Sequence, residues 1–161
     1  MVFDVLKRLL RPAAVEQGET RGAGEPVQVA TCVLLLEAAH ADETLREVEL
    51  RLVEKILADK FDLSAEAVGE LLALAAQARR ESFDLYQFTR EINENFAVEQ
   101  KLAVLENLWR VIFADGHLDS HEEALMRRLT TLLRLSHRQM IEAKLRVQKG
   151  RESQGGDEAQ G

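Results

Sequence analysis

Cysteine, proline and aromatic residues are all scarce in this sequence, and each scarcity excludes a class of protein. Cys32 is the one cysteine among 161 residues, so neither an internal disulfide nor a thiolate metal cluster can form. Two prolines and 5% aromatic residues are untypical of a β-sandwich or barrel. The remaining composition, 46% hydrophobic and 30% charged, favours one helix-rich domain.

Net positive charge and long apolar runs are absent as well. The formal charge of −7 argues against non-specific binding to nucleic acid and points to cations or basic partners. Glu37 and His40 interrupt the longest apolar run, which is too short to span a bilayer, and no signal-peptide pattern opens the chain. We therefore expect a cytoplasmic protein whose partner is another protein and not nucleic acid.

Composition divides the chain into four segments. Residues 1–11 form a short amphipathic pattern with three basic side chains, and residues 12–26 have the composition of a flexible linker. A helical domain is predicted over 27–147, followed by a disordered tail over 148–161. Peripheral membrane contact through the first segment is conceivable, but three cations are few, so docking on the domain or on a partner is favoured.

An internal repeat is the most informative feature of the predicted domain. Segments 29–56 and 102–129 match at a constant offset of 73 residues, and after a one-residue slip residues 62–70 match 134–142. Each copy therefore reads as helix, Ala-Asp turn, helix, Leu-Ser turn, helix. The matched pairs include Leu35 with Leu108, Leu45 with Leu118, Leu52 with Leu125, Ile56 with Leu129, Asp42 with Asp115, and Glu49 with Glu122.

Local signals place the helices more closely. Residues 27–41 are apolar nearly all round, which predicts a central helix with Cys32 buried inside it. Residues 82–96 should form a connecting helix whose aromatic rings fill the gap between the copies. The fold class is therefore all-α, a compact bundle of about seven helices with an internal three-helix repeat around a central apolar helix.

Capping signals support the same helices. Three pairs fit a capping box, in which the first side chain accepts from a free backbone N–H and the second reaches back to the first residue. A fourth residue, Ser64, lacks such a partner and is expected to be a plain cap. The three pairs are Thr44 with Glu47, Asp119 with Glu122, and Ser136 with Gln139.

The stretches "FADGHLDSHEE" and "HADETLREVE", with the later "RLS" and "DLS" turns, resemble the TerB domain of bacterial tellurite-resistance proteins over about residues 27–147. The resemblance implies a stress-related, non-enzymatic, all-helical domain with an acidic patch proposed to bind a metal ion. In the first copy, Glu43 stands where the second has Gly116, and Arg46 where it has Asp119. Carried over by position, the patch is Asp42, Glu49, Asp115, Asp119, Glu122 and Glu123.

Physical reasoning leaves two interpretations of this patch open. Asp42 and Asp115 are predicted at helix carboxyl ends, where the macrodipole disfavours a carboxylate and a cation would offset that cost. Carboxylate oxygens suit calcium or magnesium, although the spacing is not that of an EF-hand. Alternatively, these residues only form a turn and a capping box between two helices. Zinc or nickel bound by Asp115, His117 and His121 is a weaker possibility.

Catalysis finds no support in the sequence. No serine or cysteine lies in an elbow-like glycine context, and no phosphate-binding glycine loop is present. Two functions remain, a cation-responsive stress domain and a protein-interaction adaptor without a metal site. They differ in whether the protein binds a divalent cation.

Overall fold

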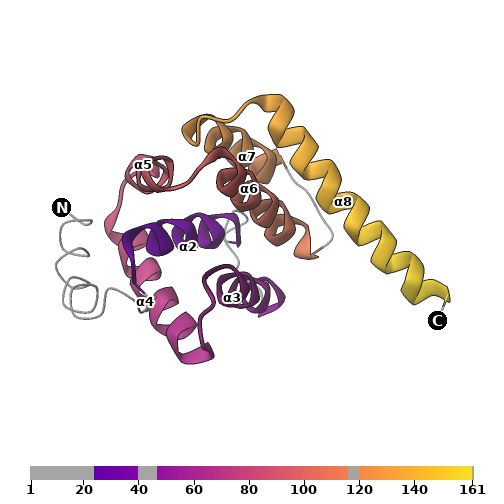
Figure 1. Ribbon diagram of the computed structural model, residues 1–161, viewed down its shortest axis with the longest axis horizontal. Helices are drawn as coiled ribbons and strands as arrows, with labels where there is room; N and C mark the ends of the chain where they lie inside the picture. Colours follow the sequence, from indigo (N-terminus) through magenta and orange to yellow (C-terminus); the bar gives the residue numbers. More distant parts are fainter. Residues whose placement is uncertain (1–23, 40–46, 116–119, 161) are drawn as a thin grey trace.

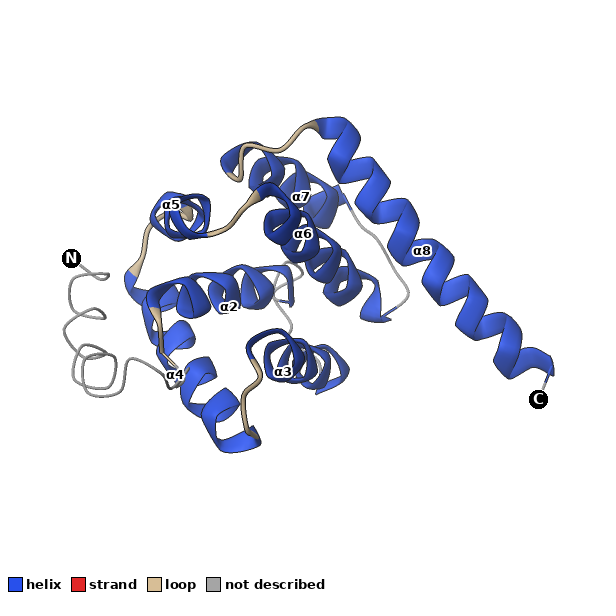
Figure 2. Ribbon diagram, viewed as in Figure 1, coloured by secondary structure: helices blue, strands red, loops and turns tan. Residues whose placement is uncertain are grey.

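The computed structural model describes residues 24–39, 47–115 and 120–160, with the backbone alone for 115 and 152–160. Over these residues the chain is all-α, with seven α-helices, one 3₁₀ helix and no strand (Figures 1 and 2). This confirms the predicted all-α class and the expected number of about seven helices, whereas the internal three-helix repeat stays a prediction. The elements are α2 (Pro26–Ala39), α3 (Glu47–Phe61), α4 (Ala65–Glu81), α5 (Tyr86–Asn95), α6 (Val98–Ile112), η1 (Phe113–Asp115), α7 (Ser120–Leu132) and α8 (His137–Gln160).

Helix α2 lies at the centre of the bundle, as its uniform apolarity predicts. All its residues except Pro26, Val27 and Glu37 are buried, and it packs against α3, α4, α5 and α6 (Figure 1). The Cys32 side chain has no exposed surface. Because lateral contacts surround the helix, every face can be apolar without exposing hydrophobic area to water.

The second half of the chain forms a smaller packed group around α6. Helix α8 packs against α6 and α7, and the buried indole Nε1 of Trp109 donates to the carbonyl oxygen of Met140 at 3.1 Å. The Trp109 ring also stacks on Phe113 with centroids 5.5 Å apart. These contacts fix the direction in which α6 enters η1. The first sequence copy spans α2, α3 and α4 and the second spans α6, α7 and α8, but their structural equivalence stays a prediction.

Two of the predicted helix starts are confirmed. Ser64 Oγ accepts from the Ala67 N–H at 3.1 Å, so it is a plain cap. Ser136 Oγ accepts from Gln139 N–H at 3.1 Å while Gln139 Oε1 accepts from Ser136 N–H at 2.8 Å, which is the complete capping box. The boxes that involve Thr44 and Asp119 lie outside the described residues.

The connecting helix is present as α5, but only part of its aromatic content is buried. Phe88 has no exposed surface and Phe96 is half-buried, whereas Phe83 and Tyr86 are exposed. The expectation that the rings fill the gap between the copies was therefore wrong for the last two. Phe83 precedes α5 in the turn after α4, so helical spacing does not direct it to the core.

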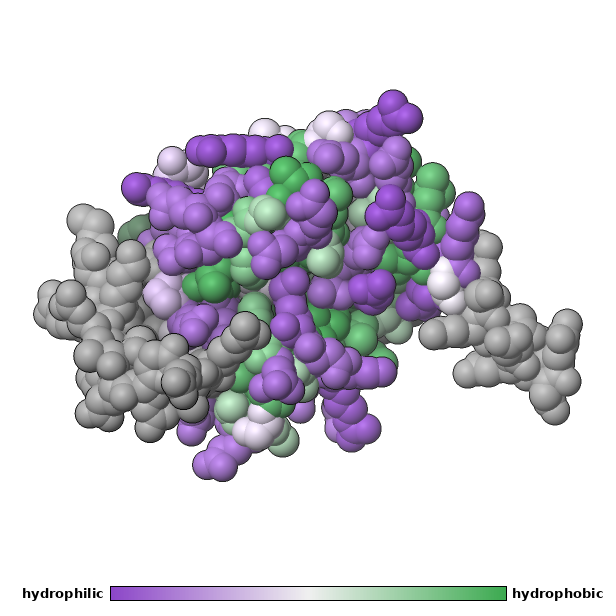
Figure 3. Space-filling view, viewed as in Figure 1, coloured by the Kyte–Doolittle hydropathy of each residue, from purple (hydrophilic) through white to green (hydrophobic). Residues whose placement is uncertain are grey.

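Helix α8 continues to Gln160 and extends away from the rest of the bundle (Figure 1), whereas composition predicts a disordered tail from residue 148. A helix already nucleated by packing gains one backbone hydrogen bond for each residue it adds, which favours continuation. The domain boundaries stay a prediction. On the face drawn in Figure 3, hydrophobic side chains emerge in small separate areas among hydrophilic ones.

Candidate functional site

Three of the six predicted metal-site carboxylates belong to described side chains. Glu49 lies in the first turn of α3, and Glu122 and Glu123 lie in the first turn of α7. Glu49 and Glu122 are buried, with only 4% and 6% of their surfaces exposed, and both take part in interactions within the protein. Glu123 is half-buried and forms an ion pair with Arg127, 3.4 Å from Nη2 to Oε1.

Helical spacing explains why Glu49 and Glu122 are buried. Glu49 precedes the buried residues Val53 and Ile56 by four and seven positions, so the three share one helix face. Glu122 has the same relation to Met126 and Leu129. Both carboxylates therefore lie on the core-facing side, at helix N-termini, where the macrodipole favours negative charge. At matched positions, both copies place an acid where most helices have an apolar residue.

The Ala-Asp turn of the second copy begins as a 3₁₀ turn. Helix α6 passes directly into η1, whose last residue is Asp115, and η1 packs against α3. The fold thus brings the helix that carries Glu49 against the turn that ends at Asp115. Helix α7, which carries Glu122, packs instead against α5, α6 and α8.

The described side chains alone do not complete a metal site. Among them, no three His, Cys, Asp or Glu residues lie close enough to hold a metal ion. His121, from the zinc alternative, is exposed on α7. Asp42, Asp119 and His117 lie outside the described residues, as does the side chain of Asp115. A cation at the turns would therefore need carboxylates from that set in addition to Glu49 or Glu122.

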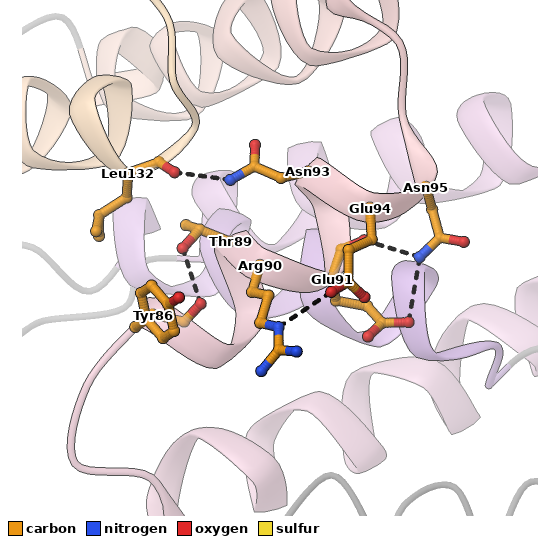
Figure 4. Close-up of polar contacts among 8 residues, drawn as sticks. All are labelled: Tyr86, Thr89, Arg90, Glu91, Asn93, Glu94, Asn95 and Leu132. Carbon is orange, nitrogen blue, oxygen red and sulfur yellow. Dashed lines mark hydrogen bonds and ion pairs between the residues drawn. The ribbon is translucent and has the colours of Figure 1, made fainter.

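One buried cation was missed by the sequence reasoning. The Lys101 side chain is buried, and its Nζ donates to the carbonyl oxygen of Leu133 at 2.9 Å and to Asn93 Oδ1 at 3.2 Å. Asn93 Nδ2 donates to the carbonyl oxygen of Leu132 at 2.9 Å (Figure 4). The signal was available, because Lys101 precedes the buried residues Val104, Leu105 and Leu108 by three, four and seven positions.

Other titratable groups owe their properties to burial. Burial raises the pKa of the Cys32 thiol, so this cysteine is unreactive as a thiolate. Burial also lowers the pKa of Lys60, whose Nζ lies 5.3 Å from the centroid of the Phe96 ring. Neither group adjoins the acidic helix ends in sequence. No described helix is long and apolar enough to cross a membrane.

The described part of the molecule is a helical bundle. Two of its core-packed helices carry a buried glutamate in their first turn. The family model for tellurite resistance protein TerB matches residues 28–145. That match covers most of the chain, which therefore belongs to the TerB family. No curated protein and no solved structure was found to match the chain.

Proposed function

We propose that this TerB domain is a non-enzymatic module that binds a divalent cation at its acidic helix junctions, with calcium or magnesium favoured over zinc. The observation that carries the proposal is the burial of Glu49 and Glu122 at matched positions in the first turns of α3 and α7. Buried carboxylates are retained when they are paired or coordinate a metal. The contact between α3 and η1 supports the proposal, because it places Asp115 in the same region as α3.

Hard cations suit this set of ligands. Calcium takes six to eight oxygen ligands and magnesium an octahedral set that retains water, so two or three carboxylates with water would suffice. The ligands proposed are Asp42, Glu49, Asp115, Asp119, Glu122 and Glu123. Glu123 is the least favoured of them, since Arg127 already neutralises its charge.

The test is thermal unfolding of chelator-treated protein with calcium, magnesium, manganese and zinc, together with calorimetric titration. A cation that binds only the folded state stabilises it by RT ln(1 + [L]/Kd), so the melting temperature should rise with concentration. Glu122→Gln and Asp115→Asn should abolish that rise. Glu70→Gln, at an exposed residue of α4, is the matched control and should retain it.

A melting temperature that does not move with any of the four ions at millimolar concentration would contradict the cation proposal. The alternative, a protein-interaction adaptor without a metal site, would then stand alone. A different region of the molecule supports that alternative, the turn around the exposed Phe83.

A further inference from the structure

The turn between α4 and α5 holds an aromatic side chain fully in solvent. Phe83 has a relative exposure of 106%, and Tyr86, three residues further on, is 58% exposed. Single exposed apolar residues are common on protein surfaces and need no explanation by themselves. Two further features distinguish Phe83. Hydrogen bonds fix the turn in which it lies, and a hollow lined by charged side chains lies beside it.

Hydrogen bonds on both sides of Phe83 fix the backbone of this turn. Ser82 Oγ donates to the carbonyl oxygen of Asp84 at 2.7 Å and accepts from Gln87 Nε2. Asp84 Oδ1 accepts from the Tyr86 N–H at 2.9 Å, at the start of α5. A partner that covers Phe83 would therefore find its backbone already ordered, which reduces the entropy cost of binding.

The hollow beside the turn has a volume of about 110 Å³. It is bounded by the turn itself, by Phe88, and by the charged side chains of Glu37, Arg79 and Arg128. Sites for small molecules usually measure about 300–1,000 Å³, so this hollow has room for one side chain and not for a drug-sized ligand. Its size thus favours a peptide side chain as the occupant.

Two acidic residues, Glu37 and Asp84, and two basic residues line the hollow, but only one ion pair forms among them. Arg79 Nε lies 2.7 Å from Glu37 Oε2, so each of these two charges neutralises the other. Arg128 lines the same hollow from α7 but forms no hydrogen bond or ion pair with a described residue. Its guanidinium is therefore available to an incoming carboxylate, for which its fork of N–H donors is suited.

We propose that this surface binds a partner protein through a peptide segment in which an aspartate or glutamate adjoins an apolar side chain. The carboxylate pairs with Arg128 in the hollow, and the apolar side chain packs on Phe83. Glu37 and Asp84 flank the site, so they would repel a doubly charged phosphate or an anionic membrane more strongly than a single carboxylate. The inference rests on the interaction-module alternative and needs no metal ion.

The test begins with selection of random displayed peptides on the full-length protein. We expect the recovered sequences to pair Asp or Glu with a large apolar residue. Synthetic copies should bind Arg128→Gln and Phe83→Ser at least about tenfold more weakly than the unsubstituted protein, as hot-spot losses do. Replacing the peptide acid by its amide should weaken binding to the unsubstituted protein but not to Arg128→Gln, which isolates the ion pair.

Two matched variants control for charge and for exposed apolar surface. Arg80→Gln removes an exposed arginine that does not line the hollow, and Leu145→Ser removes an exposed leucine on α8. Both should bind as the unsubstituted protein does, and circular dichroism with thermal melting checks that each variant is folded. Glu122→Gln should also retain peptide affinity, which separates this inference from the cation proposal.

Several results would overturn the inference. These are a selection that recovers no binding peptide, recovered peptides that bind all variants equally, or sequences without an acidic residue. Tighter binding by a phosphoserine version of a recovered peptide than by the aspartate version would replace the proposed partner by a phosphorylated one. Binding that depends on Arg128 and Phe83 together, with unchanged affinity for the controls, is the result expected.

Discussion

The carboxyl ends of α6 and α7 both carry the negative end of a helix dipole, but the chain places charges of opposite sign beside them. At the end of α7, the backbone carbonyl groups of Leu132 and Leu133 accept from Asn93 and from the buried ammonium of Lys101. At the end of α6, the chain passes through η1 to Asp115, an acid. The macrodipole is negative at both ends, so a cation is favoured and an acid disfavoured there. The α7 end receives a buried cation from the chain, whereas the α6 end leads to an acid, and Arg110 in the last turn of α6 pairs with Glu106.

The α7 end shows how this fold holds a positive charge away from water. Its ligands are a backbone carbonyl oxygen and an amide oxygen, at 2.9 and 3.2 Å from Lys101 Nζ. A metal ion bound from solution at the α6 end would supply the positive charge that Lys101 supplies at the α7 end. The comparison therefore makes the α6 end the place where an added cation should stabilise the protein.

The largest effect is expected from Lys101→Met, which keeps most of the apolar part of the side chain and removes its charge. A buried carbonyl oxygen and a partly buried amide oxygen lose their donor, so we expect the free energy of unfolding to fall by about 2–4 kcal/mol. Urea unfolding measures this change. Lys55→Met, at an exposed residue of α3, is the matched control and should change stability by less than about 0.5 kcal/mol. Equal stability of the two variants would show that α7 needs no cation at its carboxyl end.

A smaller loss is expected from Asn93→Ala. The change removes the donor to the Leu132 carbonyl and one acceptor of Lys101, so we expect a loss of about 1–2 kcal/mol. Because both residues act on one helix end, the double variant with Lys101→Met should lose less than the sum of the two single losses. Strict additivity in urea unfolding would mean that the two side chains act independently.

The capping box at Ser136 gives a reference value for the loss of stability expected at the start of α7, which carries Glu122. Ser136→Ala removes the acceptor for the Gln139 N–H and should cost about 1 kcal/mol. Ser136→Thr keeps a hydroxyl acceptor and should cost less. If Glu122 only completes such a box, Glu122→Gln should be nearly neutral in metal-free protein, because glutamine serves equally well there. A loss larger than that of Ser136→Ala would require a further role for the Glu122 charge.

The features predicted correctly from the sequence are those that depend on helical periodicity and on local capping residues. The burial of α2, the cap at Ser64 and the capping box at Ser136 follow from local patterns, and all three are observed. The burial of Lys101 and Glu49 also follows from spacing, because each precedes buried apolar residues by four and seven positions. Neither burial was predicted, because the helix faces were assigned from apolar residues alone. The exposure of Phe83 depends on which way a turn leaves α4, and no periodic pattern encodes that direction.

The smallest effect, and the most direct test of the α6 end, is that of Asp115→Asn in metal-free protein. Asparagine keeps the shape and the turn-forming capacity of aspartate, while an unfavourable contact between the charge and the helix dipole disappears. We therefore expect the free energy of unfolding to rise by a few tenths of a kcal/mol, up to about 1 kcal/mol at low ionic strength, and the gain to shrink as salt screens the charge.

The same variant should reverse its sign when a cation is present. With a saturating divalent ion, unsubstituted protein gains the binding free energy and Asp115→Asn does not, so the variant becomes the less stable of the two. The crossing of the two stability curves as cation concentration rises would be measured by thermal unfolding in a chelator series. A variant that stays slightly more stable than the unsubstituted protein at every cation concentration would leave Asp115 as a turn residue. Asp115 would then be an acid at a helix carboxyl end with no metal ion to offset its charge. Lys101 would remain the one buried cation that hydrogen-bonds a carbonyl group at a helix carboxyl end in the described part of the chain.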